Sequence, residues 1–303
     1  MPQKKAIEAD ASAIEEIMRK VHHLEIKAKR LSRESFSGEY HASFKGQGLD
    51  FEDFREYQHG DEIRFIDWNV TARMNSPFIR TFREERELTV LIAVDISGSF
   101  DFGSKYFSKR EIAAEIAAVL AFSAKHNGDK VGLLLFANEP ILFLPPAKGS
   151  RHTLRLIREV LATQAPNATT NIAGACDFIN RTLKRKSLIF LLSDFVDNDF
   201  HKKLGTLSQK HETIGIRIFD PVEQELPDVG KVNLLDPETG QERLINTSNA
   251  NVRMAYNKLN SRRLEALQKA FSKYKIDHIN AATDQDYLPL LHHLFKTRSS
   301  RHA

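Results

Sequence analysis

The sequence contains a single cysteine, Cys176, and no long run of apolar residues. One cysteine excludes an intramolecular disulfide, so a reducing compartment suits the chain best. The N-terminus lacks the basic segment followed by an apolar segment that marks a secretory signal. The longest apolar stretches, residues 88–96 and 187–192, are shorter than the roughly 20 residues that a membrane-spanning helix needs. We therefore expect a soluble, cytoplasmic protein without a membrane partner.

A large excess of one charge is also absent. The 303 residues include 44 Lys plus Arg and 40 Asp plus Glu, which gives a formal net charge of +4. Such a small positive net charge attracts polyanions only weakly. The basic run from Arg19 to Arg33 contains no motif that reads nucleic acid, and a solvated helix face explains it better. Nucleic-acid binding is therefore only a third alternative, which a steeply salt-dependent affinity for a duplex would support.

The spacing of apolar residues divides the chain into three segments. Residues 1–33 place apolar side chains three and four residues apart, which predicts an amphipathic N-terminal helix. Residues 34–86 interleave aromatic residues and glycine with charges, and predict a small subdomain of short strands and loops. Residues 87–303 form the third segment, an α/β domain with a hairpin insertion near residues 221–248.

The third segment has the pattern of a Rossmann-like fold. The apolar, β-branched runs at 88–97 and 187–195 are typical of strands buried on both faces. Residues 130–137 and 140–146 predict two strands joined as a hairpin. Predicted helices alternate with the strands, at residues 109–126, 150–163, 171–185, 200–211 and 250–274. We therefore predict an α/β fold with a mostly parallel central sheet flanked by helices.

Oxygen-bearing side chains lie where predicted strands end. Asp95, Ser97 and Ser99 follow the first strand of the α/β domain, and Asp194 follows a later strand. Thr169 and Thr170 precede a predicted helix between them. Because ligands of open α/β sheets bind outside the carboxyl ends of the strands, we expect these side chains to meet at one edge of the sheet.

These oxygen donors suit Mg²⁺ or Mn²⁺. Mg²⁺ prefers six oxygen ligands and usually retains several waters, so the hydroxyls could bind directly while Asp95 and Asp194 act partly through water. Neutral ligands leave the ion under-compensated, so it should accept an acidic side chain of a partner at its open position. The alternative is that Asp95 and Asp194 only cap helices and loops.

A metal-dependent phosphoester hydrolase is the alternative function for the same oxygen cluster. That reaction needs a positioned general base and a cation that holds phosphate. Asp101, Asp197 and Asp199 lie nearby in the sequence, but nothing in their spacing fixes their geometry. No catalytic constellation emerges, so we expect a protein that is not an enzyme.

The oxygen cluster resembles the metal-ion-dependent adhesion site of von Willebrand factor A (vWA) domains. The pattern of that site is DxSxS, a later Thr and a later Asp at a strand end. The resemblance implies metal ligation by Asp95, Ser97, Ser99, Thr170 and Asp194.

The run from Arg55 to Arg73, "REYQHGDEIRFIDWNVTAR", resembles the hallmark of a bacterial family called domain of unknown function 58, DUF58. The resemblance covers roughly residues 20–220. It implies a soluble bacterial protein that works with a MoxR-type AAA+ ATPase and other vWA proteins in chaperone-like maturation or assembly of other proteins. It implies no catalytic activity.

The hallmark run alternates arginines with carboxylates around aromatic residues. One interpretation is a recognition surface for the ATPase or a client, made by Arg55, Asp61, Arg64, Asp67, Trp68 and Arg73. The other is an ion-pair network that fixes the subdomain onto the sheet. A lattice of this kind is an ordinary way to hold a loop-rich segment, so we prefer the structural interpretation.

Overall fold

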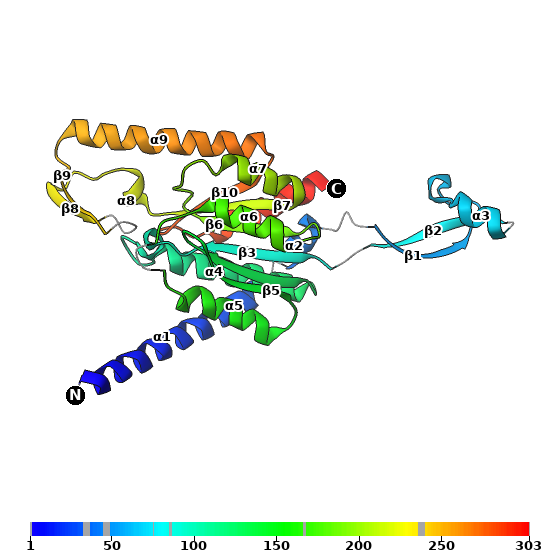
Figure 1. The fold of residues 1–303 in the computed structure, drawn as a ribbon, viewed down its shortest axis with the longest axis horizontal. Helices are drawn as coiled ribbons and strands as arrows, with labels where there is room; N and C mark the ends of the chain where they lie inside the picture. The colour runs from blue at the N-terminus through cyan, green and yellow to red at the C-terminus, as the bar shows by residue number, and fades with distance from the viewer. Residues whose placement is uncertain are drawn as a thin grey trace.

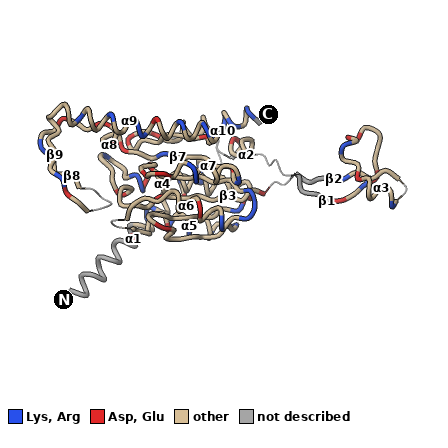
Figure 2. Tube along the Cα trace, turned by 45° about the horizontal axis from the view of Figure 1, so that its top comes forward, with Lys and Arg blue, Asp and Glu red and all other residues tan. Residues whose placement is uncertain are grey.

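The structure is a computed structural model, and it describes residues 2–32, 37–44, 49–74, 76–84, 87–165, 168–235 and 240–302. Its main body is a six-stranded sheet with helices on both faces. A two-stranded hairpin lies away from the main body in both views of the chain (Figures 1 and 2).

The strand order of the central sheet is β10-β7-β6-β3-β4-β5. Five strands are parallel, and the edge strand β5 runs antiparallel to β4. The chain builds outward from β3 in one direction and then crosses over to β6, so the topological switch point lies between these two strands. The predicted mostly parallel sheet is confirmed, with strands β3 (Thr89–Asp95), β4 (Lys130–Phe136), β5 (Pro140–Ala147), β6 (Leu188–Ser193), β7 (Glu212–Phe219) and β10 (Asp277–Ala282).

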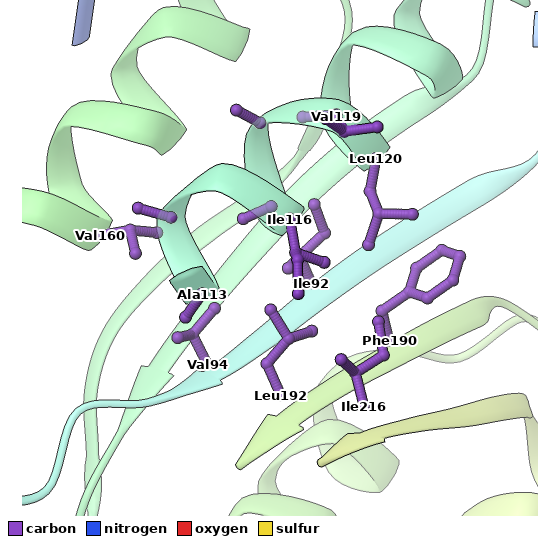
Figure 3. Packing of buried hydrophobic residues seen from close by; sticks show 14 of the residues in the cluster. Ile92, Val94, Ala113, Ile116, Val119, Leu120, Val160, Phe190, Leu192 and Ile216 are labelled. Carbon is purple, nitrogen blue, oxygen red and sulfur yellow. The ribbon is translucent and has the colours of Figure 1, made fainter. Parts of the chain in front are cut away.

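Successive residues of β3 face opposite helical layers, because side chains alternate along a strand. Ile92 and Val94 pack against Ala113 and Ile116 of helix α4 (Figure 3). The layer on this face consists of α1 (Pro2–Leu31), α2 (Ser37–Ser43), α4 (Lys109–His126), α5 (Ser150–Ala162) and α10 (Leu288–His302). The opposite face is covered by α6 (Ile172–Thr182), α7 (His201–Lys210) and α9 (Ala250–Lys273).

Helix α4 begins at the carboxyl end of the sheet. Its N-terminus has a capping box, in which the Ser108 hydroxyl accepts the Glu111 N–H at 3.2 Å and the Glu111 carboxylate accepts the Ser108 N–H at 3.0 Å. The cap fixes where the helix starts and so places Lys109, its first residue, beside the strand ends.

The segment 34–86 contains two structurally separate parts. Helix α2 packs against α10, and Tyr40 and Phe44 belong to the core of the main body. The rest forms a hairpin that we call the arm. It consists of β1 (Leu49–Glu56), the 3₁₀ turn η2 (Ile63–Phe65), α3 (Trp68–Met74) and β2 (Phe78–Glu84).

The predicted hairpin insertion near residues 221–248 is present. Helix α8 (Pro221–Gln224) precedes the antiparallel pair β8 (Lys231–Leu235) and β9 (Glu242–Asn246). Residues 236–239, which separate these two strands in the sequence, lie outside the described residues. Among the helices that the structure describes, none is long and apolar enough to cross a membrane.

We predict that Phe44→Ala destabilises the main body, although the arm begins only five residues further along the chain, at Leu49. The Phe44 ring lies 5.4 Å from that of Phe295 and 6.0 Å from that of Phe190, between centroids. Removing a buried ring leaves a cavity, so the free energy of unfolding should fall by about 3–5 kcal/mol in a denaturant titration. Met74→Ala, at a 60% exposed position of the arm, is the control; it should change stability by about 0.5 kcal/mol or less. Equal effects would contradict the assignment of α2 to the body.

Candidate functional site

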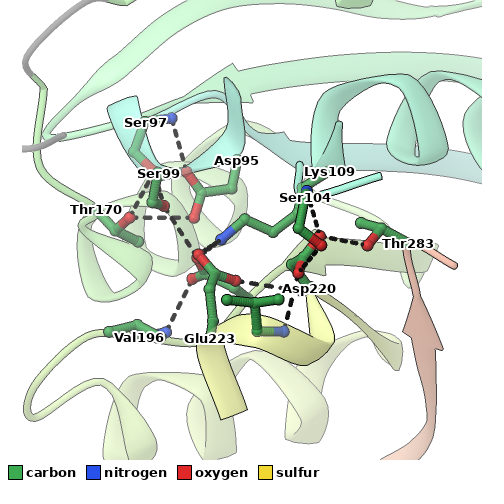
Figure 4. Close-up of polar contacts among 12 residues, drawn as sticks. Asp95, Ser97, Ser99, Ser104, Lys109, Thr170, Val196, Asp220, Glu223 and Thr283 are labelled. Atoms are coloured by element: carbon green, nitrogen blue, oxygen red, sulfur yellow. Dashed lines mark hydrogen bonds and ion pairs between the residues drawn. The ribbon is translucent and has the colours of Figure 1, made fainter. Parts of the chain in front are cut away.

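Asp95 ends β3 and is fully buried at the switch point. One carboxylate oxygen, Oδ1, accepts the Ser97 N–H at 2.9 Å. The other, Oδ2, accepts the Ser193 hydroxyl at 2.7 Å and the Thr170 hydroxyl at 3.2 Å, and Figure 4 shows the Thr170 contact. The carboxylate therefore joins three chain segments that are far apart in sequence.

Three hydroxyls form a continuous row beside Asp95, and we call this row the hydroxyl cluster. Thr170 Oγ1 also lies 2.8 Å from Ser97 Oγ, and Ser97 Oγ lies 3.3 Å from Ser99 Oγ (Figure 4). Backbone hydrogen bonds fix the supporting loops: Ile96 N–H donates to the Phe136 carbonyl at 2.8 Å, and Gly98 N–H donates to the Ala168 carbonyl at 3.0 Å.

Asp194 follows β6 and borders the hydroxyl cluster. Its Oδ2 accepts the Ser99 hydroxyl at 2.9 Å, and its Oδ1 accepts the Val196 N–H at 3.0 Å. The five residues predicted as metal ligands, Asp95, Ser97, Ser99, Thr170 and Asp194, therefore lie together in one hydrogen-bonded group.

The backbone after Asp194 has a conformation that is rare for a bulky residue. Phe195 has φ of 58°, in the left-handed region. Its ring lies 5.3 Å from that of Phe271 and 6.1 Å from that of Phe200, between centroids, and its N–H donates to Ser193 Oγ at 3.0 Å. Packing of this kind is what maintains a strained backbone at a functional site. The turn carries Asp194 toward the cluster.

Lys109 is a member of the site that the sequence reasoning missed. Its side chain is 1% exposed, and its ammonium donates to Asp194 Oδ2 at 2.9 Å and to Glu223 Oε1 at 2.8 Å. The sequence contained one indication of its role, because Lys109 is the first residue of a helix that is apolar on almost every side. Glu223 belongs to α8, where its other oxygen accepts the Asp220 N–H at 3.2 Å.

Asp220 fixes the neighbouring loops. Its carboxylate accepts the N–H and hydroxyl of Ser104 at 2.8 and 2.7 Å, the Thr283 hydroxyl at 2.7 Å and the Val222 N–H at 3.0 Å (Figure 4). These bonds join the connection before α4, the start of α8 and the end of β10. They hold α8, and therefore Glu223, against the ammonium of Lys109.

The pKa values of the two aspartates are shifted in opposite directions by burial and neighbouring charge. Burial, reinforced by the charge of Asp194, raises the pKa of Asp95 to about 6. Burial also acts to raise the pKa of Asp194, but the Lys109 ammonium outweighs it and holds that pKa below its usual range. Burial acts to lower the pKa of Lys109, and the carboxylates of Asp194 and Glu223 reverse this, so the ammonium is charged at neutral pH.

The hydroxyl cluster is compatible with a divalent cation that prefers oxygen. An octahedral shell with Mg–O distances of about 2.1 Å places neighbouring ligand oxygens roughly 3 Å apart. The two observed spacings, 2.8 and 3.3 Å, lie near that value. In the described part of the chain, no group of three or more His, Cys, Asp or Glu side chains could hold a metal ion. An ion at this site would therefore depend on the three hydroxyls, Ser97, Ser99 and Thr170.

Two of the three carboxylates that the hydrolase alternative could use as a base are engaged elsewhere. Asp101 pairs with Arg110 at 2.6 Å. Asp197 accepts the Ile172 N–H at 2.8 Å, at the start of α6. Asp199 is exposed on the loop that leads to α7. Cys176 is a small buried side chain, and burial raises the pKa of its thiol to about 12.

The acidic residues of the hallmark run organise the arm from within. Asp61 receives both guanidinium nitrogens of Arg55, at 2.7 and 2.8 Å. Asp67 starts α3 by accepting the N–H of Asn69 at 2.9 Å, and it also accepts Nε of Arg80 at 2.7 Å. These pairs join parts of the arm to each other. The preferred interpretation held that these pairs fix the subdomain onto the sheet, and in this respect it is wrong. The sequence indicates that arginines and carboxylates can pair, but it does not show which element they pack against.

The other three hallmark residues point outward. Arg64 pairs with Glu62 and lies over the Phe65 ring, with its guanidinium 4.8 Å from the centroid. Trp68 is 68% exposed, and Arg73 is exposed on the same helix. The arm therefore presents an aromatic ring and arginines to solvent.

Comparisons with known proteins identify relatives over most of the chain. The family described as "Protein of unknown function DUF58" matches residues 53–266. An uncharacterised protein of Mycobacterium tuberculosis (strain H37Rv) is 32% identical over 220 residues, which are 72% of this chain and 69% of that protein. The conserved hypothetical protein BatB from Bacteroides thetaiotaomicron is 16% identical, with a TM-score of 0.47 over 70% of this chain and 99% of that one. The SpRpn10 VWA domain is 12% identical, with a TM-score of 0.40 over 70% and 95%.

The raised pKa of Asp95 predicts a distinct pH dependence of stability. The folded protein keeps the Asp95 proton up to about pH 6, whereas the unfolded chain loses it near 3.8. Between these values the unfolded state binds fewer protons, so this carboxyl lowers the free energy of unfolding as pH rises from about 4 to 6 and adds no further change above 6. Urea titrations of the wild type and Asp95→Asn, in a chelator, measure the difference in stability. The difference should change across that window and be constant above it; a difference that is the same at every pH would contradict the prediction.

Proposed function

Since the chain belongs to the DUF58 family and has a vWA-like α/β fold, we propose that it is a non-enzymatic protein-interaction module that recognises an acidic side chain through a bound Mg²⁺ or Mn²⁺. It works with a MoxR-type AAA+ ATPase, and with other vWA proteins, in chaperone-like maturation or assembly of other proteins. The arm binds the ATPase, and the carboxyl end of the sheet binds the client or partner.

The observation that carries the metal site is the convergence of the hydroxyl cluster with two buried carboxylates. Ser97, Ser99 and Thr170 would hold the ion directly, and Asp95 and Asp194 would hold its waters. When bound, the ion supplies a positive charge that accepts a carboxylate ligand from another protein. Because its direct protein ligands are neutral, much of that charge would remain available to the partner.

Ser97 and Ser99 follow β3 in the sequence, so their hydroxyls can be removed without replacing a strand residue. We predict that the double variant Ser97→Ala, Ser99→Ala binds Mn²⁺ at least about tenfold more weakly than the wild type in isothermal titration calorimetry, because two direct ligands are lost. Ser150→Ala, which removes an exposed hydroxyl at the start of α5, is the control and should bind like the wild type. If the double variant binds metal and partner unchanged, the metal bridge does not exist.

The arm suits the proposed contact with the ATPase because it has a rigid frame and an exposed face. The forked Arg55–Asp61 pair and the Asp67–Arg80 pair fix its shape, while Trp68 is exposed. Trp and Arg are enriched among the residues that dominate the energy of protein interfaces. The exposed face therefore suits recognition of a protein, and the paired carboxylates suit a supporting role.

We predict that Trp68→Ala and Arg73→Ala each weaken binding to the purified MoxR-type ATPase, by about tenfold or more for the tryptophan. Neither side chain is buried, so the unfolding midpoint should not change. Asn69→Ala, on the exposed surface of the same short helix, is the control for the arm. Wild-type affinity in both variants would exclude the arm as the contact, and no binding by the wild type would exclude the ATPase as the partner.

A further inference from the structure

Lys109 places a permanent positive charge next to the hydroxyl cluster. Its ammonium and the Ser99 hydroxyl donate to the same atom, Asp194 Oδ2, both at 2.9 Å (Figure 4). That oxygen has two lone pairs, and these two donors use both. Any cation held by the hydroxyl cluster would have to share this oxygen with the ammonium or displace it.

The position of Lys109 is unfavourable without its partners. It is the first residue of an 18-residue helix, where the helix dipole favours anions over cations. It is also 1% exposed, so the ammonium has lost its hydration. Asp194 and Glu223 together offset both costs, which explains why two carboxylates converge on one lysine. An isolated buried lysine would not be tolerated here.

The two carboxylates that hold Lys109 differ in their distance from the hydroxyl cluster. Asp194 accepts the hydroxyl of Ser99, which belongs to the hydroxyl cluster, whereas Glu223, in α8, contacts the ammonium. Glu223 is itself fixed, because its backbone carbonyl accepts Tyr256 Oη and Asn260 Nδ2, both at 2.8 Å. The ammonium can therefore leave Asp194 and keep a charged partner.

From this juxtaposition we propose that Lys109 is a tethered cation that competes with the divalent ion for Asp194 and so sets the metal affinity of the site. The proposal rests on the metal site described under Proposed function. While the ammonium contacts Asp194, the site has its own counter-ion and remains stable without metal. When a divalent ion binds, Lys109 moves to Glu223 alone. Metal binding is therefore weak at rest and is strengthened by any partner that draws Lys109 away from Asp194.

The test compares metal binding by the full-length wild type with that of Lys109→Met, which keeps the aliphatic stem and removes the charge. Lys105→Met is the matched control, because Lys105 precedes the same helix and pairs with Asp284 at 2.9 Å on the exposed surface. Mn²⁺ is titrated into each protein, and thermal unfolding is measured with Mn²⁺ and with a chelator. We expect Lys109→Met to bind at least about tenfold more tightly than the wild type and to depend on metal for its stability. Lys105→Met should bind within about twofold of the wild type.

The possible outcomes distinguish a failure of this proposal from a failure of the proposed metal site. If the wild type binds Mn²⁺ and Lys109→Met binds it equally or more weakly, the competition is refuted and the metal site stands. If only Lys109→Met binds Mn²⁺, the competition is supported and a metal-dependent wild type is refuted. If no variant binds Mn²⁺, both are refuted.

A second pair of variants tests the proposal if Lys109→Met does not fold. Glu223→Gln removes the carboxylate to which Lys109 would move, so the ammonium stays on Asp194 and the affinity for Mn²⁺ should fall severalfold. Glu225→Gln removes the same charge two residues further along, at an exposed position, and should have little effect. Equal affinities in the two variants would overturn the proposal.

Discussion

The buried ion pair between Lys109 and Asp194 joins the first helix after β3 to the end of β6, across the switch point of the sheet. Breaking one partner of such a pair leaves an uncompensated charge in a dry environment, which is far costlier than losing a surface pair. The connection of β3 to α4, the turn at Phe195 and the start of α8 all serve to keep these two charges together. The hydroxyl cluster lies directly beside this pair.

The sheet order explains why a site exists at this place. Because β3 and β6 are parallel neighbours whose following segments run in opposite directions across the sheet, their carboxyl ends open a crevice. Asp95 comes from one strand end and Asp194 from the other. Burial raises the pKa of Asp95 to about 6, whereas the Lys109 ammonium holds the pKa of Asp194 below its usual range. Below about pH 6 the site therefore holds one protonated and one ionised carboxylate.

Alternation of strands and helices was enough to predict the sheet, and position at strand ends was enough to find Asp95, Ser97 and Ser99. Asp194 followed from the same rule, whereas Thr170 was chosen over Thr169 from the family pattern. Lys109 did not, because its partners lie 85 and 114 residues away in the sequence and its charge resembles that of any surface lysine. The division of residues 34–86 was also missed, since the aromatic residues that enter the core, such as Phe44, resemble those of the arm.

The proposed metal recognition and the internal charge compensation meet at one atom, Oδ2 of Asp194. The most direct measurement is a crystal structure of the full chain grown with Mn²⁺, with anomalous data collected for that ion. The predicted result is one anomalous peak bound by Ser97, Ser99 and Thr170, with the Lys109 ammonium withdrawn from Asp194 and retained by Glu223. A saturated crystal with no peak at the hydroxyl cluster, or a peak there with the Lys109–Asp194 contact still at 2.9 Å, would contradict it.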